Sequence, residues 1–567
     1  MQIAFRDARS SGPDDNTYKT LFGYNELNQL TSVTDPLGRT LNNNYDDAGN
    51  LSAATFPNGK KILYSYDAAN RLSQKSYSSE TTKYSFLYDA AGNLQQVSDN
   101  EGRSYLNTYD KANRLTSITD IFGYKLDYNL DDTGNITNIA DSNNKTIAYA
   151  YGSADQLLTL TDPGGKKTHY RYDESGRPFE IIRGNGLKSI LIYDQAGRLK
   201  QIADPGNPDG SLFHYEYDAN GNITQIHGVK GIETFDYDAL NRLTNWTDET
   251  GNTTTYTFDA VGNLTKKGNK TFTYNAANEI TNPGFTYDQN GNLTSDGNFN
   301  YFYDSENRLN KVTKVSDGST VATYKYDYRG LRISKTTASG AIRYHWDDNE
   351  RLIRDSDVNG NTLALYIYND QDQLVAIEKG GQMYYTHTNY RGDILAITDA
   401  TGNKVATYKY GPWGELLSQT GTFSQPFRYA GYYYDSETSL YYLKARYYSP
   451  DLGRFLTKDT FKGFNDNPIS LNLYAYANGN PVINTDPNGH YAQAVALAGG
   501  VALGPVGLAV VGTATIATCI GVYYFKEHTK NKRKSTYNKH TKPRPGRATE
   551  KKKQTSKWKK NPNKRKR

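Results

Sequence analysis

Two aspartates near the end of the tyrosine-rich part of the chain are the residues best suited to acid–base chemistry. Asp459 and Asp486 lie 27 positions apart. If the fold brings their carboxyls together, repulsion between like charges raises the pKa of one and leaves an acid beside a base. Such a pair can activate water or promote cleavage of a peptide bond. The alternative is that each aspartate only starts a turn, as many others in this chain do.

The C-terminal tail contains a second set of candidates. His528, His540 and Glu550 are its only residues suited to general acid–base catalysis. Their spacing matches no metal site and no nuclease motif, so we expect no metal, no cofactor and no nuclease activity. Residues 526–567 carry 19 Lys and Arg against two Glu, which leaves −11 on residues 1–525 within a total of +6. This charge predicts a disordered tail that could bind nucleic acid.

An uncharged segment lies between these two sets. No charged residue occurs from Tyr491 to Phe525. Its last part, residues 506–525, is long enough to cross a bilayer as a helix, and the basic residues that follow would keep that side cytoplasmic. Two interpretations stay open: a membrane-spanning helix, or an Ala/Gly-rich hairpin buried within the preceding fold.

The elements that must position the two aspartates come from an internal repeat. A landmark position, held by the tyrosine of a Tyr-Asp pair in most repeats, recurs every 21 or 22 residues up to Tyr193. The segment from Tyr66 to Leu72, in which a turn residue and Leu follow the pair, is an example. The tyrosine ends an alternating, strand-like run, and the aspartate can accept a backbone N–H two residues on. Gly or Asn then tolerates the left-handed backbone of a turn. Each repeat is therefore predicted to form one β-hairpin.

The composition supports a β fold. The 567 residues include 50 Tyr and 50 Gly but only two Met and one Cys, Cys519, which excludes a helical bundle for most of the chain and a disulfide scaffold. About twenty repeats predict about forty strands, more than one open twisted sheet holds. We expect an all-β fold, a long spiral of hairpins forming a hollow β-shell, followed by an apolar helical segment and a disordered basic tail. A solid β-solenoid is the alternative.

The repeats and the motif that follows them resemble a known family. Pro426–Asp435, Gly453–Asp459 and Asp486–His490 look like the RHS-associated core domain, and residues 20–490 resemble the YD- or RHS-repeat proteins, which include bacterial toxin shells, wall-associated toxins and teneurins. The resemblance implies a spiralling β-shell around a C-terminal cargo. The expected parts are an irregular N-terminus (1–20), the β-shell (21–425), the core motif (426–490), the apolar segment (491–525) and a basic effector tail (526–567).

In several members of this family the core domain cuts its own chain. The resemblance implies that Asp459 and Asp486 are the catalytic pair of an aspartate-type self-cleaving protease. It makes Arg454 a candidate for orienting them or supporting their charge, and it places the cut near His490 and Tyr491. The chain departs from the family at two positions: Thr460 stands where self-cleaving members often have Pro, and His490 stands where many have Leu.

The function expected from this resemblance is encapsulation and delivery of a short toxin-like effector in contact-dependent competition between bacteria. The expected partners are the chain's own C-terminal segment as cargo, a cognate immunity protein, and a target-cell membrane or carbohydrate. We expect a secreted or cell-surface location, although Met1–Arg6 contains no apolar run typical of a signal peptide. The chain is expected to begin inside the repeats, as a fragment or a short paralogue would. The alternatives are a non-enzymatic surface protein that binds carbohydrate and a decayed toxin cassette.

Overall fold

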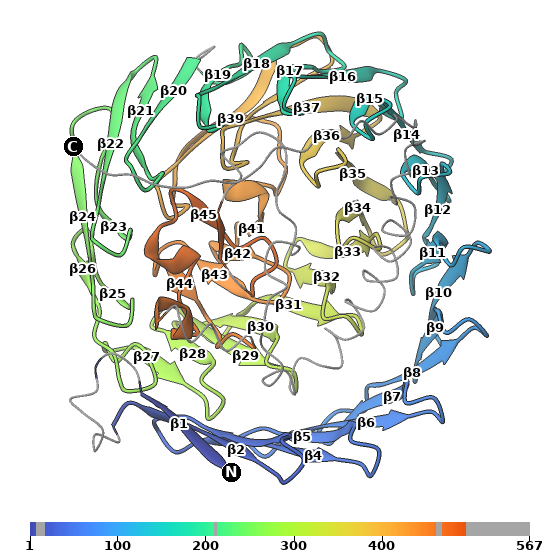
Figure 1. The fold of residues 1–567 in the computed structure, drawn as a ribbon, viewed down its shortest axis with the longest axis vertical. Helices are drawn as coiled ribbons and strands as arrows, with labels where there is room; N and C mark the ends of the chain where they lie inside the picture. Colours follow the sequence, from blue (N-terminus) through green and yellow to red (C-terminus); the bar gives the residue numbers. More distant parts are fainter. Residues whose placement is uncertain (7–8, 10–16, 209–211, 461–467, 491, 495–567) are drawn as a thin grey trace, which may run out of the picture. The chain divides into compact units, whose positions relative to one another are not determined.

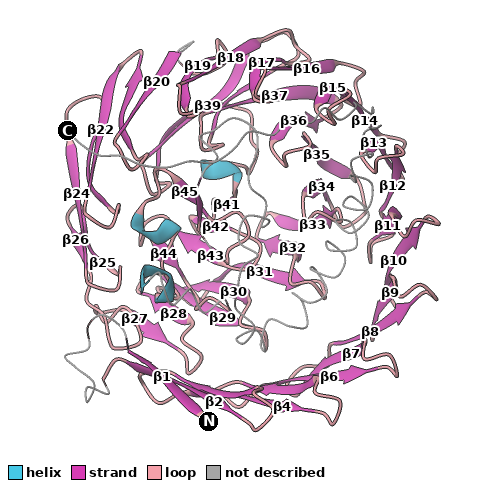
Figure 2. Ribbon diagram, in the orientation of Figure 1, coloured by secondary structure: helices cyan, strands magenta, loops and turns pink. Residues whose placement is uncertain are grey.

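The computed structural model describes residues 1–6, 9, 17–208, 212–460, 468–490 and 492–494. All of them belong to one compact unit, Met1–Val522, and the second unit, Tyr523–Arg567, lies outside the described residues. The described residues form strands, turns and three one-turn 3-10 helices (Figure 2). The predicted all-β class is therefore confirmed. The predicted apolar helical segment and disordered tail lie outside the described residues, and a hollow interior stays a prediction.

The first sheet is built from strands β1 to β26, each paired antiparallel with the strand that follows it in the sequence. These strands follow one another around an arc in Figure 1. Their bounds are β1 (Gln2–Arg6), β2 (Lys19–Tyr24), β3 (Leu30–Thr34), β4 (Thr40–Tyr45), β5 (Leu51–Thr55), β6 (Lys61–Tyr66), β7 (Leu72–Tyr77), β8 (Lys83–Tyr88), β9 (Leu94–Asp99), β10 (Ser104–Tyr109), β11 (Leu115–Thr119), β12 (Lys125–Leu130), β13 (Ile136–Asp141), β14 (Thr146–Tyr151), β15 (Leu157–Thr161), β16 (Lys167–Tyr172), β17 (Pro178–Ile182), β18 (Lys188–Tyr193), β19 (Leu199–Ala203), β20 (Leu212–Tyr217), β21 (Ile223–Gly228), β22 (Gly231–Tyr237), β23 (Leu243–Thr247), β24 (Thr253–Phe258), β25 (Leu264–Lys267) and β26 (Lys270–Thr271).

The second sheet continues the same pairing from β27 to β40 and lies inside the arc of the first (Figure 1). Its strands are β27 (Phe285–Tyr287), β28 (Leu293–Asp296), β29 (Phe299–Tyr303), β30 (Leu309–Lys314), β31 (Thr320–Tyr326), β32 (Arg332–Thr337), β33 (Gly340–Trp346), β34 (Leu352–Ser356), β35 (Thr362–Tyr368), β36 (Leu374–Lys379), β37 (Gln382–Thr388), β38 (Ile394–Thr398), β39 (Lys404–Tyr410) and β40 (Leu416–Gly421).

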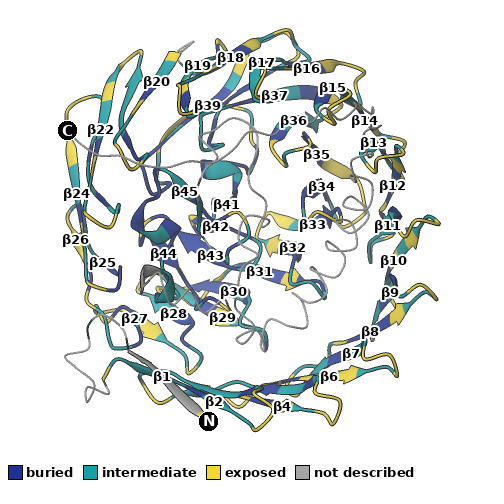
Figure 3. Cartoon of the chain, in the orientation of Figure 1, coloured by how far each residue is buried: buried dark blue, intermediate teal, exposed yellow. Residues whose placement is uncertain are grey.

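The core motif forms a small four-stranded sheet and a two-stranded one. The elements are η1 (Tyr429–Gly431), β41 (Tyr433–Asp435), β42 (Leu440–Tyr442), β43 (Tyr447–Ser449), β44 (Arg454–Phe455), η2 (Pro468–Leu471), η3 (Ala477–Gly479), β45 (Asn484–Thr485) and β46 (Gln493–Ala494). Burial follows this layering (Figure 3). Along β12 buried residues mostly alternate with exposed ones, whereas every residue of β34 is buried. The second sheet is thus buried on both faces at β34, whereas its last strand, β40, is mostly exposed.

The aspartate of the repeat fixes the shape of the hairpin turns that it starts. At Asp67 the Oδ1 atom accepts the N–H groups of Ala69 (2.9 Å) and Arg71 (3.0 Å). The Oδ2 atom accepts Nε of Arg71 at 2.8 Å. Asn70, the third residue after the aspartate, takes a φ of 55°, which Asn and Gly adopt most easily. The sequence prediction of an Asp-initiated turn is confirmed for most of the repeats, whereas turns such as that of Gly152 begin without an aspartate.

The landmark tyrosines tie each hairpin to the previous one. The hydroxyl of Tyr66 donates to the carbonyl of Leu51 at 2.9 Å, and the hydroxyl of Tyr88 donates to that of Leu72 at 2.9 Å. The guanidinium of Arg71 lies over the Tyr88 ring at 4.5 Å. Because a hairpin cannot bury both faces alone, these repeated contacts stabilise the stack of neighbours.

Buried histidines connect the two large sheets. Nδ1 of His345 in β33 donates to Oδ2 of Asp120 at 2.5 Å, and Nδ1 of His387 in β37 donates to Oδ1 of Asp204 at 2.9 Å. The side chain of His387 is fully buried, and Arg183 also pairs with Asp204 at 3.0 Å. These bonds join residues of the first sheet to residues about two hundred positions later in the second.

The sequence prediction of a transmembrane helix is not supported and is corrected here. Among the described residues, no helix is long and apolar enough to cross a membrane. The physical reason is that this part of the chain satisfies its backbone hydrogen bonds between short strands and not within helices. Residues 506–525, on which the prediction rested, lie outside the described residues, and no membrane span enters the function proposed below.

The buried His387 predicts an acid-sensitive fold. Burial, helped by the charges of Arg183 and Lys404, lowers the pKa of His387 to about 4 although Asp204 opposes the shift. An unfolded histidine titrates near pH 6.5. The neutral, buried His387 therefore lowers the free energy of unfolding as the pH falls from about 6.5 towards 4, by about 3 kcal/mol in all, and has no such effect above about pH 6.5. Thermal unfolding at about pH 7.5 and about pH 5 should show a smaller acid-induced fall in Tm for His387→Gln than for the wild type.

The matched control for this prediction is His169→Gln, because His169 lies exposed on a strand of the same fold. This control should keep the full acid-induced fall in Tm. Equal falls in the wild type and in His387→Gln would contradict the assignment of the acid sensitivity to His387.

Candidate functional site

The core motif holds the two sequence-predicted aspartates at the ends of its short strands. Asp459 follows β44, and its N–H donates to the carbonyl of Leu473 at 2.9 Å. Asp486 follows β45, and its N–H donates to the hydroxyl of Tyr432 at 2.8 Å. Both side chains are buried, with 8% of Asp459 and 2% of Asp486 exposed. Buried carboxyls need a partner, because transfer of a charge out of water is costly.

That partner is Arg446, which lies between β42 and β43. Its Nη2 atom lies 2.7 Å from Oδ2 of Asp459 and 3.3 Å from Oδ2 of Asp486, so the two carboxyls share one guanidinium nitrogen. Its Nη1 atom donates to the carbonyl of Leu473 at 2.9 Å, and its Nε atom donates to that of Gly489. These contacts bring together two aspartates that are separate in sequence.

Arg446 was not identified from the sequence. It stands in the run Tyr441 to Tyr448, where large aromatic residues flank it on both sides. Its guanidinium carbon lies 3.6 Å from the centre of the Phe455 ring, and its side chain is 5% exposed. A buried arginine usually pairs with an anion, so an arginine between aromatic strand residues was the sequence feature that could have identified Arg446.

Asp486 also forms a turn like those of the repeats. Its Oδ1 atom accepts the N–H of His490, four residues on, at 3.0 Å, as Asp67 accepts that of Arg71. Gly489 closes the turn with a φ of 75°, and a Cβ there would lie 2.7 Å from the carbonyl oxygen of Leu443. Asp486 therefore starts a turn through Oδ1 and contacts Arg446 through Oδ2.

The surroundings of Asp486 raise the pKa of its carboxyl. Burial raises the pKa of Asp486, and the neighbouring Asp459 raises it further against the lowering effects of Arg446 and His490. A proton on one of two adjacent carboxyls is the arrangement expected for an acid–base pair.

The residues around the expected cut lie next to these carboxyls. Nδ1 of His490 lies 3.4 Å from Oδ1 of Asp459 and 3.3 Å from the hydroxyl of Thr460. Tyr491 lies outside the described residues. On the far side of it, Gln493 in β46 pairs with Thr485 in β45, so the expected cut falls within a hairpin whose two arms are paired.

Arg454, the basic residue proposed from the family resemblance, lies elsewhere. Its Nη2 atom donates to the carbonyl of Asn278 at 2.6 Å, and its guanidinium lies over the rings of Tyr474 (4.5 Å) and Tyr274 (5.1 Å). The structure therefore does not bring Arg454 to the two carboxyls. The reason is that β44 points alternate side chains to opposite faces, so Arg454 faces away from the Phe455 side where Arg446 lies.

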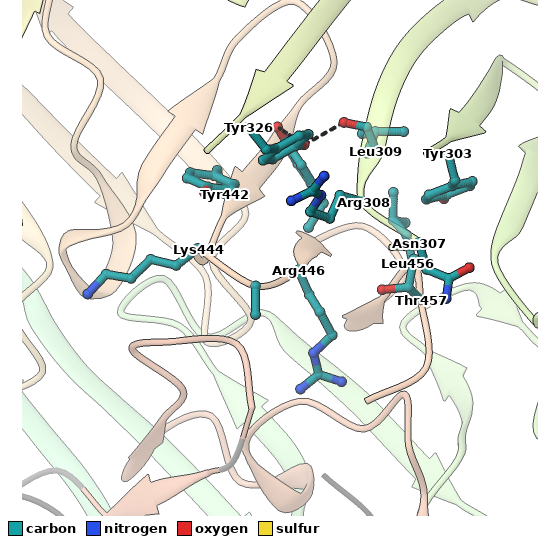
Figure 4. A pocket seen from close by; sticks show the side chains of 12 residues that line it. Tyr303, Asn307, Arg308, Leu309, Tyr326, Tyr442, Lys444, Arg446, Leu456 and Thr457 are labelled. Atoms are coloured by element: carbon teal, nitrogen blue, oxygen red, sulfur yellow. Dashed lines mark hydrogen bonds between the residues drawn. The ribbon is translucent and has the colours of Figure 1, made fainter. Parts of the chain in front are cut away.

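A small pocket opens beside Arg446 (Figure 4). Within the described ranges, no three His, Cys, Asp or Glu side chains lie together so that they could hold a metal ion. The pocket is lined by Tyr303, Asn307, Arg308, Leu309, Tyr326, Tyr442, Lys444, Ala445, Arg446, Tyr447, Leu456 and Thr457. Arg446 thus lines the pocket and also contacts Asp459 and Asp486.

Comparison with known proteins identifies related chains. The profile of the Teneurin YD-shell family matches residues 9–131, 71–190 and 183–482. The tRNA nuclease WapA of Bacillus subtilis is 38% identical over 299 residues, which cover 51% of this chain and 11% of WapA. The chain thus spans about a tenth of the length of that relative.

Two solved structures share the fold. The crystal structure of TcdB2-TccC3-Cdc42 matches 83% of this chain and 30% of its own, with a TM-score of 0.67 and 18% identity. The Tc holotoxin pore of Photorhabdus luminescens matches 87% of this chain and 32% of its own, with a TM-score of 0.54 and 19% identity. At this level of identity the likeness concerns the fold alone.

The shared arginine predicts a specific stability defect. Arg446→Met leaves two buried carboxyls side by side without their cation, which should lower the free energy of unfolding by about 3 kcal/mol at neutral pH. Because both carboxyls then gain from taking up protons, the difference from the wild type should shrink in acid. Urea unfolding of both proteins at about pH 7 and about pH 4 measures this change.

Arg446→Lys is the control, because it keeps a positive charge near the carboxyls and should lose less stability. A loss that is the same at both pH values would show that Arg446 stabilises the core through packing on Phe455 and not through the two aspartates.

Proposed function

The chain belongs to the Teneurin YD-shell family, as its repeats predicted, and on this premise we propose that it is a toxin-delivery shell that cuts its own chain near His490. The observation that carries the proposal is the pairing of Asp459 and Asp486 on the single guanidinium of Arg446. The backbone N–H of His490 is bonded to Asp486, so the expected cleavage site and the carboxyls share one turn.

The proposed reaction is hydrolysis of the peptide bond between His490 and Tyr491. The carboxylate of Asp459 takes a proton from a water molecule while the water oxygen bonds to the carbonyl carbon of His490. The bond from that carbon to nitrogen breaks, and the nitrogen of Tyr491 leaves as an amine with the proton from Asp486. One proton passed from Asp459 to Asp486 restores the starting pair. The raised pKa of Asp486 supports its role as the proton donor.

Arg446 would hold both carboxyls at the distance this reaction needs and balance their charge. Buried, hydrogen-bonded side chains lose little freedom when the reaction begins, so a preformed site of this kind lowers the barrier. The carbonyl of Gly489 is bound by the same guanidinium, which fixes the segment immediately before the cut. Arg454 is assigned no part in the reaction.

The proposed cargo is the segment that follows the cut, residues 491–567. Its last 42 residues carry 19 Lys and Arg, a charge suited to binding nucleic acid or other polyanions. Membership of this family is the reason for proposing a cognate immunity protein as the partner that protects the producing cell. It also supports release outside that cell, in contact-dependent competition between bacteria. No catalytic activity is proposed for the cargo.

Self-cleavage is tested by the mass of the purified full-length chain. Wild-type protein should separate into two pieces near residue 490, whereas Asp459→Asn and Asp486→Asn should stay intact or cut at least about a hundredfold more slowly. Asp451→Asn is the control, since Asp451 is an exposed aspartate of the same motif and should cut normally. A single uncut wild-type chain would overturn the proposal.

The toxin role is tested by growth. Expression of residues 491–567 alone in a bacterial host should slow growth, because the cargo is then outside the shell. The full-length Asp486→Asn chain should leave growth normal, because its cargo is not released. Unimpaired growth with residues 491–567 at equal expression would argue against a toxin cargo and leave only the self-cleaving shell.

A further inference from the structure

A partly buried ion pair joins the residue before Asp459 to one of the first hairpins of the chain. Nζ of Lys458 lies 2.7 Å from Oδ2 of Asp35, across 423 positions of sequence. Only 19% of the lysine side chain and 17% of the aspartate side chain are exposed. The stem of Lys458 also packs on Gly291, closely enough that a Cβ at that position would collide with it.

The pair belongs to a cluster of four charges. Arg39 lies 2.7 Å from Oδ2 of Asp35 and 2.6 Å from Glu279, so two cations and two anions alternate. Burial lowers the pKa of Lys458 and Asp35 opposes that shift. Although burial acts against it, Lys458 and Arg39 lower the pKa of Asp35. The cluster is therefore balanced only while Lys458 and Asp35 stay in contact.

The same contact region reaches further into the core motif. Arg39 donates to the carbonyl of Asp288 at 3.3 Å, and the hydroxyl of Tyr474 donates to the carbonyl of Gly291 at 2.6 Å. Arg454 binds this region as well, through the carbonyl of Asn278. Residues 278–291 thus lie between the early hairpin and the strand that leads to Asp459.

The contact with Lys458 distinguishes Asp35 from a turn of the same type. Asp99 begins the matching turn Asp99–Arg103, and its Oδ2 atom accepts Nε of Arg103 at 2.7 Å just as Asp35 accepts Arg39. Both aspartates use Oδ1 to accept the N–H groups of their turn. Only at Asp35, of these two, does Oδ2 also hold an ammonium from the core motif.

We propose that Lys458 is a positioning residue for Asp459, and that docking of the Asp35–Arg39 turn on Lys458 completes the cleavage site. The inference rests on the self-cleavage proposed above. Asp459 is held on one side by the bond from its N–H to Leu473 and by Arg446. On the other side it follows Lys458, whose ammonium has its partner in Asp35. Without that partner the ammonium is left partly buried and unpaired, and a shift of Lys458 towards water would displace the adjoining Asp459.

The consequence is an order of events in the folding chain. Asp459 reaches its cutting position only after the early hairpin has docked on the core motif, so the cargo is cut after the repeats have come together. A displacement of about 1 Å at a reacting group is enough to slow a reaction by about a hundredfold. Loss of this contact should therefore slow cleavage strongly while the fold persists.

The experiment follows cleavage of the full-length chain over time after cell-free synthesis, by intact mass. Lys458→Met and Asp35→Asn should cut at least about tenfold more slowly than the wild type. Lys458→Arg should recover most of the rate, because it keeps a cation that reaches Asp35. Asp99→Asn makes the same chemical change as Asp35→Asn in the matching turn and should cut at the wild-type rate.

The outcomes separate this inference from the proposed function. A wild-type chain that never cuts overturns both. Wild-type cleavage with an equal rate in Lys458→Met and Asp35→Asn overturns the positioning role and leaves self-cleavage standing. Equal slowing by Asp35→Asn and Asp99→Asn also overturns it, because the effect would then be a general weakening of turns. Melting temperatures of the same variants in an Asp486→Asn background show that each is folded.

Discussion

The structure depends on the way each turn aspartate divides its two carboxylate oxygens. One oxygen, Oδ1, accepts the backbone N–H groups of its own turn, and this set of bonds gives the aspartate-initiated turns a common shape. The other oxygen is then available for a side chain. In a standard repeat, such as that of Asp67, it binds the arginine four residues on. A turn can therefore change its partner without changing its geometry.

Several contacts between layers use this second oxygen. Oδ2 of Asp162 accepts the hydroxyl of Tyr385, and Oδ2 of Asp120 accepts Nδ1 of His345. In both cases the residue four positions on is not Arg or Asn, so the oxygen is available to the second sheet. The same local motif thus builds hairpins and also supplies contacts between the two sheets, beside ion pairs such as that of Lys75 with Glu306.

The sequence was sufficient to predict the features that depend on residues close together in the chain. Tyr66, Asp67 and Asn70 lie within one turn, so a period of 21 or 22 residues was enough to predict strands, turns and their repetition. Arg446 and the contact of Lys458 with Asp35 could not be predicted in this way. Their partners lie far away in sequence, and a single chain gives no sign of which of many aspartates each cation meets.

The candidate site follows from the same division of oxygens. Asp486 uses Oδ1 for its turn, as the repeats do, but His490 stands where a repeat places Arg or Asn. Its Oδ2 atom instead meets Arg446, which also contacts Asp459. The turn needs only the backbone N–H of residue 490, so a histidine there is compatible with a site whose relatives often carry leucine. The turn of Asp486 thus keeps the backbone geometry of the repeats, while its second oxygen meets the guanidinium that also binds Asp459.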